Sequence, residues 1–166
     1  MSDEGYEKHI ERFTRLLPSS GDLTLILLKG HLLIEEQLLA ILEGFAQTPS
    51  CLKKAKLSFS QKLWMVRALT PAVLNDRFFP FAKRLNALRN ALAHNAELEE
   101  LEDRVDELLQ IARGLGCSVC PMPPLDRSRA IAMAIAWTCG LVRELGHFVV
   151  EAAKQKNQEG LKPGIA

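Results

Sequence analysis

Apolar residues recur at helical spacing along almost the whole of this 166-residue chain. No segment shows the strict alternation of apolar and polar residues that is typical of a half-buried β-strand. Residues three or four apart lie on one face of an α-helix, so each segment must bury an apolar face against another element. The sequence therefore predicts an all-α fold, which we expect to be an up-and-down bundle of five to six helices.

Proline, glycine and capping residues delimit the first three expected helices. The first is marked by Tyr6, Ile10, Phe13 and Leu17 and stopped by Pro18. The second covers about residues 23–46, follows the capping residues Ser19 to Asp22, and is apolar over most of its surface, which predicts a central position. The third covers residues 59–69 and follows a capping box formed by Ser58 and Gln61.

Three more helices are expected in the second half of the chain. Asn75-Asp76 opens a helix over residues 77–94 with Pro80 in its first turn. An acidic helix follows over residues 97–113, with an apolar stripe formed by Leu98, Leu101, Val105, Leu108, Leu109 and Ala112. Asp126 or Ser128 caps a long last helix that reaches about residue 156. We expect one domain over residues 1–159 and a frayed tail over residues 160–166.

Nothing in the sequence predicts export or insertion into a membrane. The first residues are acidic and lack the apolar core of a secretory signal. The most apolar stretch, residues 130–142, is too short to span a bilayer, which needs about 20 apolar residues. These features predict a cytoplasmic protein with no membrane partner.

The net charge of +1 conceals a strong segregation of charge along the chain. Residues 53–96 hold nine basic residues and one acidic residue, a net of +8, whereas residues 97–107 carry a net of −6. A basic patch is the electrostatic footprint of phosphate binding. The alternative is that the acidic helix packs beside the basic segment and neutralises it, and the sequence leaves both interpretations open.

The strongest candidate for chemistry is the pattern Arg89-Asn90-x-x-x-His94. A shuffled chain of this composition is expected to contain this three-residue pattern on the order of 0.01 times, so it is a usable signal. Arginine offers a phosphate a planar fork of donors, and histidine can transfer a proton near neutral pH. On one helix, Asn86, Asn90 and His94 share a face, but Arg89 and His94 lie about 140° apart around the axis. Either His94 turns back at the helix end or a second copy of the chain completes the site.

At these residues the chain resembles the HEPN superfamily of α-helical bundle domains, many of which are RNases of toxin–antitoxin and phage-defence systems. The hallmark of that family is an Arg, then a polar residue, then a His after four to six positions, which Arg89, Asn90 and His94 match. The resemblance covers about residues 20–95 and includes the apolar helix with internal acids around Glu35. It implies a homodimer whose motif helices face each other across a basic cleft, and a cognate antitoxin as a possible further partner.

The resemblance also implies metal-independent endoribonuclease activity, in which the 2′-OH of RNA attacks and a 2′,3′-cyclic phosphate is left. Arg89 would stabilise the phosphate, His94 would act as acid or base, and Asn90 would orient the site. No metal or other cofactor is needed for this reaction. Many members of the family keep the fold, lack nuclease activity and serve as binding modules. The alternative function is therefore a non-catalytic helical dimer, either a transcriptional regulator or the partner of an antitoxin.

Further residues are candidate contributors to this site. Lys62, Arg84 and Asn86 are candidate RNA contacts. Glu35 and Glu36 lie in a strongly apolar helix, where a buried carboxylate needs a partner such as Arg89, and an exposed position on the polar edge is equally compatible with the sequence. His31, one turn before Glu35, has the spacing to pair with it.

Two other patterns are assigned no chemistry. Cys117 and Cys120 have the C-x-x-C spacing, but a structural zinc site normally needs a second pair at comparable spacing. Arg143 and His147 lack an intervening Asn and lie in an apolar segment, so we expect them to be structural.

Overall fold

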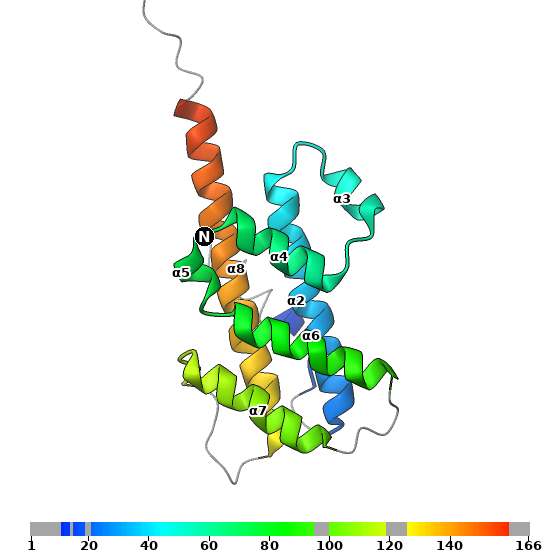
Figure 1. Cartoon of the computed structure of the whole chain (residues 1–166). Coiled ribbons are helices and arrows are strands. Elements are labelled where there is room, and N and C mark those ends of the chain that lie inside the picture. The colour runs from blue at the N-terminus through cyan, green and yellow to red at the C-terminus, as the bar shows by residue number, and fades with distance from the viewer. Residues whose placement is uncertain (1–10, 14, 19–20, 95–99, 119–125, 160–166) are drawn as a thin grey trace, which may run out of the picture.

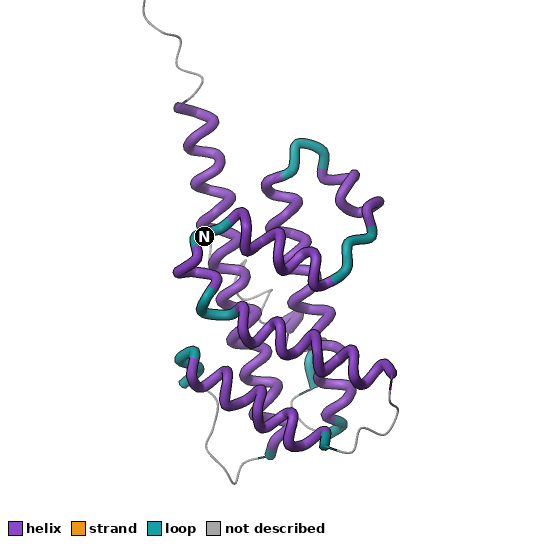
Figure 2. The backbone as a smooth tube through the Cα atoms, viewed as in Figure 1, coloured by secondary structure: helices purple, strands orange, loops and turns teal. Residues whose placement is uncertain are grey.

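The computed structural model describes residues 11–13, 15–18, 21–94, 100–118 and 126–159, with the backbone alone for residues 150 and 152–159. The described residues contain helices and loops and no strand (Figure 2), which confirms the all-α prediction. Residues 11–13 and 15–16 are helical and precede Pro18. The labelled helices are α2 (Leu23–Phe45), α3 (Pro49–Ala55), α4 (Phe59–Leu69), α5 (Ala72–Asn75), α6 (Phe79–His94), α7 (Leu101–Gly114) and α8 (Arg127–Glu159).

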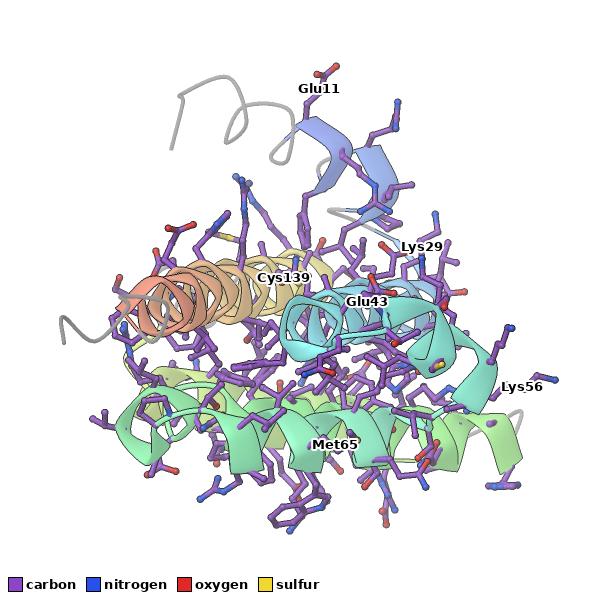
Figure 3. All side chains as sticks on the ribbon, turned by 90° about the horizontal axis from the view of Figure 1, so that it is seen from above. Glu11, Lys29, Glu43, Lys56, Met65 and Cys139 are labelled. Carbon is purple, nitrogen blue, oxygen red and sulfur yellow. The ribbon has the colours of Figure 1, made fainter. Side chains whose placement is uncertain are left out.

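The long helices form two layers. Helices α2 and α8 lie side by side and run in the same direction, while α4, α6 and α7 form a second layer that crosses them (Figure 1). Successive helices of the second layer run in opposite directions. Side chains fill the space between the two layers (Figure 3). Because α2 contacts α8, α3, α4 and α6, it is the central helix, as its apolar surface predicts.

Capping side chains begin the helices where the sequence predicts. Asp22 accepts hydrogen bonds from the backbone nitrogens of Thr24 (2.8 Å) and Leu25 (3.4 Å) at the start of α2. Ser58 and Gln61 form the predicted capping box at the start of α4. Of the two candidates for α8, Asp126 is the cap, since its carboxylate accepts from the backbone nitrogen of Ser128 at 2.9 Å. These contacts are local, which is why the sequence reveals them.

The number of helices exceeds the expected five to six because two short helices, α3 and α5, occupy connections. Helix α5 begins directly after Pro71, so this proline starts a further turn. The prediction that Asn75 opens the next helix was wrong. Asn75 is buried, and its amide donates to the carbonyl oxygen (3.1 Å) and the hydroxyl (2.6 Å) of Thr70. Helix α6 therefore starts at Phe79, two residues later than expected, with Pro80 still in its first turn.

Buried apolar side chains from Leu17 to Val149 form one core cluster. The acidic helix contributes the predicted stripe through Val105, Leu108, Leu109 and Ala112, which are all buried. Leu98, Tyr6, Ile10 and the tail over residues 160–166 lie outside the described residues. Among the described residues, no helix is long and apolar enough to cross a membrane.

Candidate functional site

The Arg89–His94 motif occupies the C-terminal half of α6, and His94 is the last residue of the helix. Asn90 and His94 are exposed, whereas Asn86 and Arg89 are partly buried. Because α6 is helical throughout, Asn86, Asn90 and His94 lie along one stripe, and Arg89 lies on its flank. The angular separation of Arg89 and His94 therefore persists in the folded protein.

A buried histidine of α2 lies beneath this stripe. His31 is 5% exposed, and its Nε2 lies 3.0 Å from the Oδ1 of Asn86. Its ring stacks on Phe59 of α4, with ring centroids 4.2 Å apart. His31 thus joins three helices, α2, α4 and α6, at the point where the second layer crosses the first.

An ion pair lies next to the histidine. Lys62 Nζ of α4 is 2.7 Å from Glu35 Oε1 of α2, and both side chains are largely buried, with 12% and 23% exposed. Glu35 Oε2 is 4.0 Å from His31 Nδ1, which exceeds hydrogen-bond distance. Glu35 therefore bonds to Lys62 and acts on His31 only through its charge.

Burial lowers the pKa of His31, which disfavours its charged form. The hydrogen bond to Asn86 and the carboxylate of Glu35 act in the opposite direction, while Arg89 and Lys62 add to the lowering. With the amide oxygen of Asn86 facing Nε2, the hydrogen bond requires the proton on Nε2, and Nδ1 is then unprotonated. The neutral imidazole is a structural donor to the motif helix.

Arg89 does not bind either carboxylate considered for it. Glu35 pairs with Lys62, and the exposed Glu36 pairs with Arg12 at 2.7 Å. The Nη1 of Arg89 lies 3.4 Å from Oδ1 of Asn90. Among the described residues, no carboxylate forms an ion pair with Arg89, so its charge is not neutralised there.

The two basic residues considered as phosphate contacts both have carboxylate partners. Lys62 is held by Glu35, and Arg84 of α6 pairs with Glu107 of α7. The acidic helix therefore neutralises part of the basic segment. Its other described pairs join Glu102 and Asp106 to Arg127 of α8, and Arg104 to Glu100 at the start of the same helix.

Several basic residues of this segment are not neutralised by any described carboxylate. Four basic residues of this segment form no ion pair with any described residue. They are Lys54, Lys56, Arg77 and Lys83. All four are exposed. Of the two interpretations of the charge segregation, neutralisation by the acidic helix thus applies to Arg84, while exposed basic side chains without an ion pair among the described residues remain at α3 and α6.

The cysteines show no shared site within the part of the chain that the structure describes. Cys117 and Cys139 are buried, and burial raises the pKa of the Cys139 thiol. Cys120 lies outside the described residues. No group of three His, Cys, Asp or Glu among the described residues is placed to hold a metal ion.

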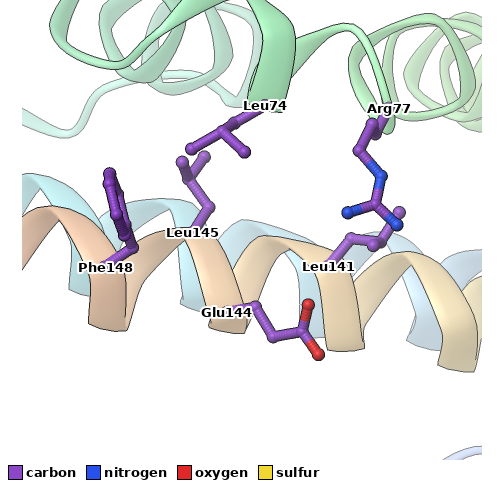
Figure 4. A pocket seen from close by; sticks show the side chains of 6 residues that line it. All are labelled: Leu74, Arg77, Leu141, Glu144, Leu145 and Phe148. Atoms are coloured by element: carbon purple, nitrogen blue, oxygen red, sulfur yellow. The ribbon is translucent and has the colours of Figure 1, made fainter.

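A separate pocket of about 250 Å³ lies between α5 and α8 (Figure 4). Leu74 and Leu145 face each other in it, with Phe148 and Arg77 on either side. It contains none of the motif residues, and it is smaller than the pockets of about 300 Å³ or more that enclose small-molecule ligands. This pocket is therefore separate from the motif end of α6, which is the candidate site.

Two contributions to this site were not found from the sequence. The spacing of His31 and Glu35 indicated a pair within α2, but not the hydrogen bond from His31 to Asn86, which is 55 positions away. Phe59 gave no signal beyond its place in an apolar helix face. A scan of protein-family models finds none that matches this chain, and searches of curated proteins and of solved structures find no match either.

Proposed function

We propose that the protein is a metal-independent endoribonuclease of the HEPN type, in which Arg89, Asn90 and His94 act on the scissile phosphate of RNA. The observation that carries this proposal is the state of Arg89: its guanidinium lies on the flank of an exposed motif stripe and has no carboxylate partner among the described residues. An arginine in this state has its donors available for a phosphate.

The proposed chemistry uses few groups. The 2′-OH of the substrate is the nucleophile, Arg89 stabilises the charge that develops on the phosphorus oxygens, and His94 transfers the proton. Asn90, whose amide oxygen lies 3.4 Å from Arg89 Nη1, orients the guanidinium. The step leaves a 2′,3′-cyclic phosphate and a 5′-hydroxyl.

A homodimer is part of the proposal. Arg89 and His94 lie about 140° apart on one helix, and in this proposal a second copy brings both groups to one phosphate. A dimer would also bring together two copies of the surface that carries the motif and the exposed Lys83 of α6. An antitoxin that covers this surface would be a natural regulator, and a cytoplasmic location fits an RNA substrate.

Labelled single-stranded RNA incubated with the protein in EDTA tests the activity. We expect cleavage by the wild type, and a loss of about 100-fold or more in Arg89→Ala and His94→Ala. Arg129→Ala is the matched control. The substitution also removes one arginine charge, but Arg129 is exposed on α8 and is not part of the motif helix α6. Cleavage that is absent from the wild type, or unchanged in both motif variants, would overturn the proposal.

Product analysis and molecular mass test the details. A terminal cyclic phosphate and resistance of an all-DNA strand are expected, because the 2′-OH supplies the nucleophile. Light scattering during gel filtration is expected to give twice the chain mass of 18.5 kDa. A monomer that cleaves RNA would contradict the composite site while leaving the reaction in place.

The second candidate function is a non-catalytic helical interaction module. The observation that favours it is a set of exposed apolar side chains on α4 and α5: Trp64, Met65, Leu69 and Val73. Exposed apolar residues gathered on neighbouring elements are typical of protein contacts. A wild-type protein that dimerises but never cleaves RNA would favour this candidate.

A further inference from the structure

The most exposed large aromatic side chain on the second layer is Trp64. It lies on α4 and is 52% exposed. Its ring meets Phe79, the first residue of α6, edge to face, with centroids 4.9 Å apart and planes at 65°. The guanidinium of Arg67 in turn lies 4.2 Å from the centroid of the Phe79 ring. Trp64 is therefore a supported ring with much of its surface open to solvent.

The chain segment that carries Trp64 is basic. The segment that forms α3, α4, α5 and α6 contains one acidic residue, Asp76, and this residue is paired with Arg67 at 3.1 Å. Lys83, one turn after Phe79, is exposed and has no carboxylate partner among the described residues. A polyanion is attracted to such a surface, whereas an apolar protein surface gains nothing from these charges.

Helix geometry connects Trp64 to the motif. Phe79, Lys83, Asn86, Asn90 and His94 fall within about 80° of arc on α6, so they form a single stripe along the helix. Asn90 lies about 16 Å along this stripe from Phe79, where Trp64 is in contact. The stripe thus begins at an exposed aromatic ring, passes an unpaired lysine and ends at the motif.

We propose that Trp64 is a base-stacking subsite for the single-stranded RNA that the motif cleaves, a few nucleotides from the scissile phosphate. This inference rests on the proposed endoribonuclease function and deepens it. A nucleobase stacks on the exposed face of Trp64, and Lys83 contacts a phosphate between that base and the phosphate bound by Arg89. Binding by aromatic stacking next to a basic track is tolerant of sequence, because every base has a π-face.

Tryptophan fluorescence tests the stacking directly. The chain has two tryptophans, so a Trp137→Phe background leaves Trp64 as the reporter. The probe is a 2′-O-methyl RNA dodecamer, which lacks the nucleophile and cannot be cleaved. We expect it to quench Trp64, and we expect the same strand with abasic sugars to quench much less. Equal quenching by both strands would overturn the proposal, because phosphates without bases would then suffice.

Affinity measurements with variants separate stacking from apolar contact. Trp64→Leu keeps an apolar side chain but removes the π-face, and we expect it to bind the dodecamer about tenfold more weakly. Trp64→Phe is expected to retain most of the affinity. Phe148→Leu is the control, since Phe148 is a 60% exposed aromatic residue on α8 and not on α4 or α6. Unchanged affinity of Trp64→Leu for the dodecamer would overturn the proposal. A variant that loses self-association but not RNA affinity would overturn it as well.

The wild-type cleavage rate in EDTA distinguishes failure of this inference from failure of the proposed function. If the wild type cleaves RNA through Arg89 and Trp64→Leu binds as tightly as the wild type, the stacking subsite is wrong and the nuclease stands. If the wild type neither binds nor cleaves RNA, the nuclease is wrong and the subsite is overturned with it.

Discussion

His31 Nε2 lies 3.0 Å from Asn86 Oδ1 and so connects the central helix α2 to the helix that carries the motif. The histidine is buried and stacked on Phe59, so packing and the hydrogen bond together fix its position. Burial is the main cause that lowers the pKa of His31, and the charge of Arg89 on α6 also lowers it. The candidate site therefore rests on a rigid support.

Removing the His31 hydrogen bond should destabilise the protein. His31→Leu keeps much of the volume against Phe59 but leaves the partly buried amide oxygen of Asn86 without its donor. We expect a loss of about 1–3 kcal/mol in the free energy of unfolding, measured with urea. Asn90 is exposed on α6, the helix of Asn86, and Asn90→Ala should change the free energy of unfolding by less than about 0.5 kcal/mol. Equal effects of the two variants would contradict a supporting role for His31.

Stability should fall on mild acidification. The pKa of His31 is lowered by burial, so between that lowered value and the ordinary value of about 6.5 the unfolded chain binds more protons than the folded one. The contribution of His31 to the free energy of unfolding is fully present above about pH 6.5. Below that pH it decreases by at most about 1.4 kcal/mol per pH unit. Urea unfolding at several pH values measures the slope. His31→Leu should flatten it, and an unchanged slope would show that other groups cause the decrease.

The Lys62–Glu35 pair should matter more than an exposed pair of the same length. Lys62→Met leaves the carboxylate of Glu35 largely buried without its partner, and we expect a loss of about 1–3 kcal/mol. Arg12–Glu36 is the matched control: its distance is also 2.7 Å, but its side chains are 46% and 57% exposed. Arg12→Met should cost less than about 1 kcal/mol.

A double-mutant cycle checks the cause of that loss. If it arises from the unpaired carboxylate, Lys62→Met combined with Glu35→Gln should be less destabilised than the sum of the two single variants. Additive losses would indicate that the two side chains contribute separately through packing.

Two glycine substitutions should have opposite signs. A Cβ on Gly30 of α2 would lie 2.5 Å from Cδ1 of Ile135 on α8, so Gly30→Ala should push the two central helices apart and cost about 1–3 kcal/mol. At Gly140, on the same α8, a Cβ would meet nothing within 4 Å, and alanine should stabilise the helix by about 0.5–1 kcal/mol. Thermal unfolding measures both, and a stabilising Gly30→Ala would contradict the close approach of α2 and α8.

The sequence by itself determined the helices and the positions of the motif residues along one of them. Asp22, Ser58 with Gln61, and Asp126 act on backbone groups two or three residues away, and these contacts do not depend on the rest of the fold. The shared face of Asn86, Asn90 and His94 likewise follows from helical geometry. Asn75 is the exception among the predicted capping residues, because its buried amide donates a hydrogen bond to the hydroxyl of Thr70 in the turn after α4.

Only the tertiary structure decided which charges meet. The partner of Glu35 was Lys62, 27 positions away, and the partner of Arg84 was Glu107, 23 positions away. The apolar pattern of a helix gives the face that it buries but not the neighbour against which that face packs. The crossing of α4 and α6 over α2 brought His31, Lys62 and Asn86 together, and it left Arg89 without a carboxylate partner among the described residues. The availability of the motif arginine is thus a consequence of how the helices pack.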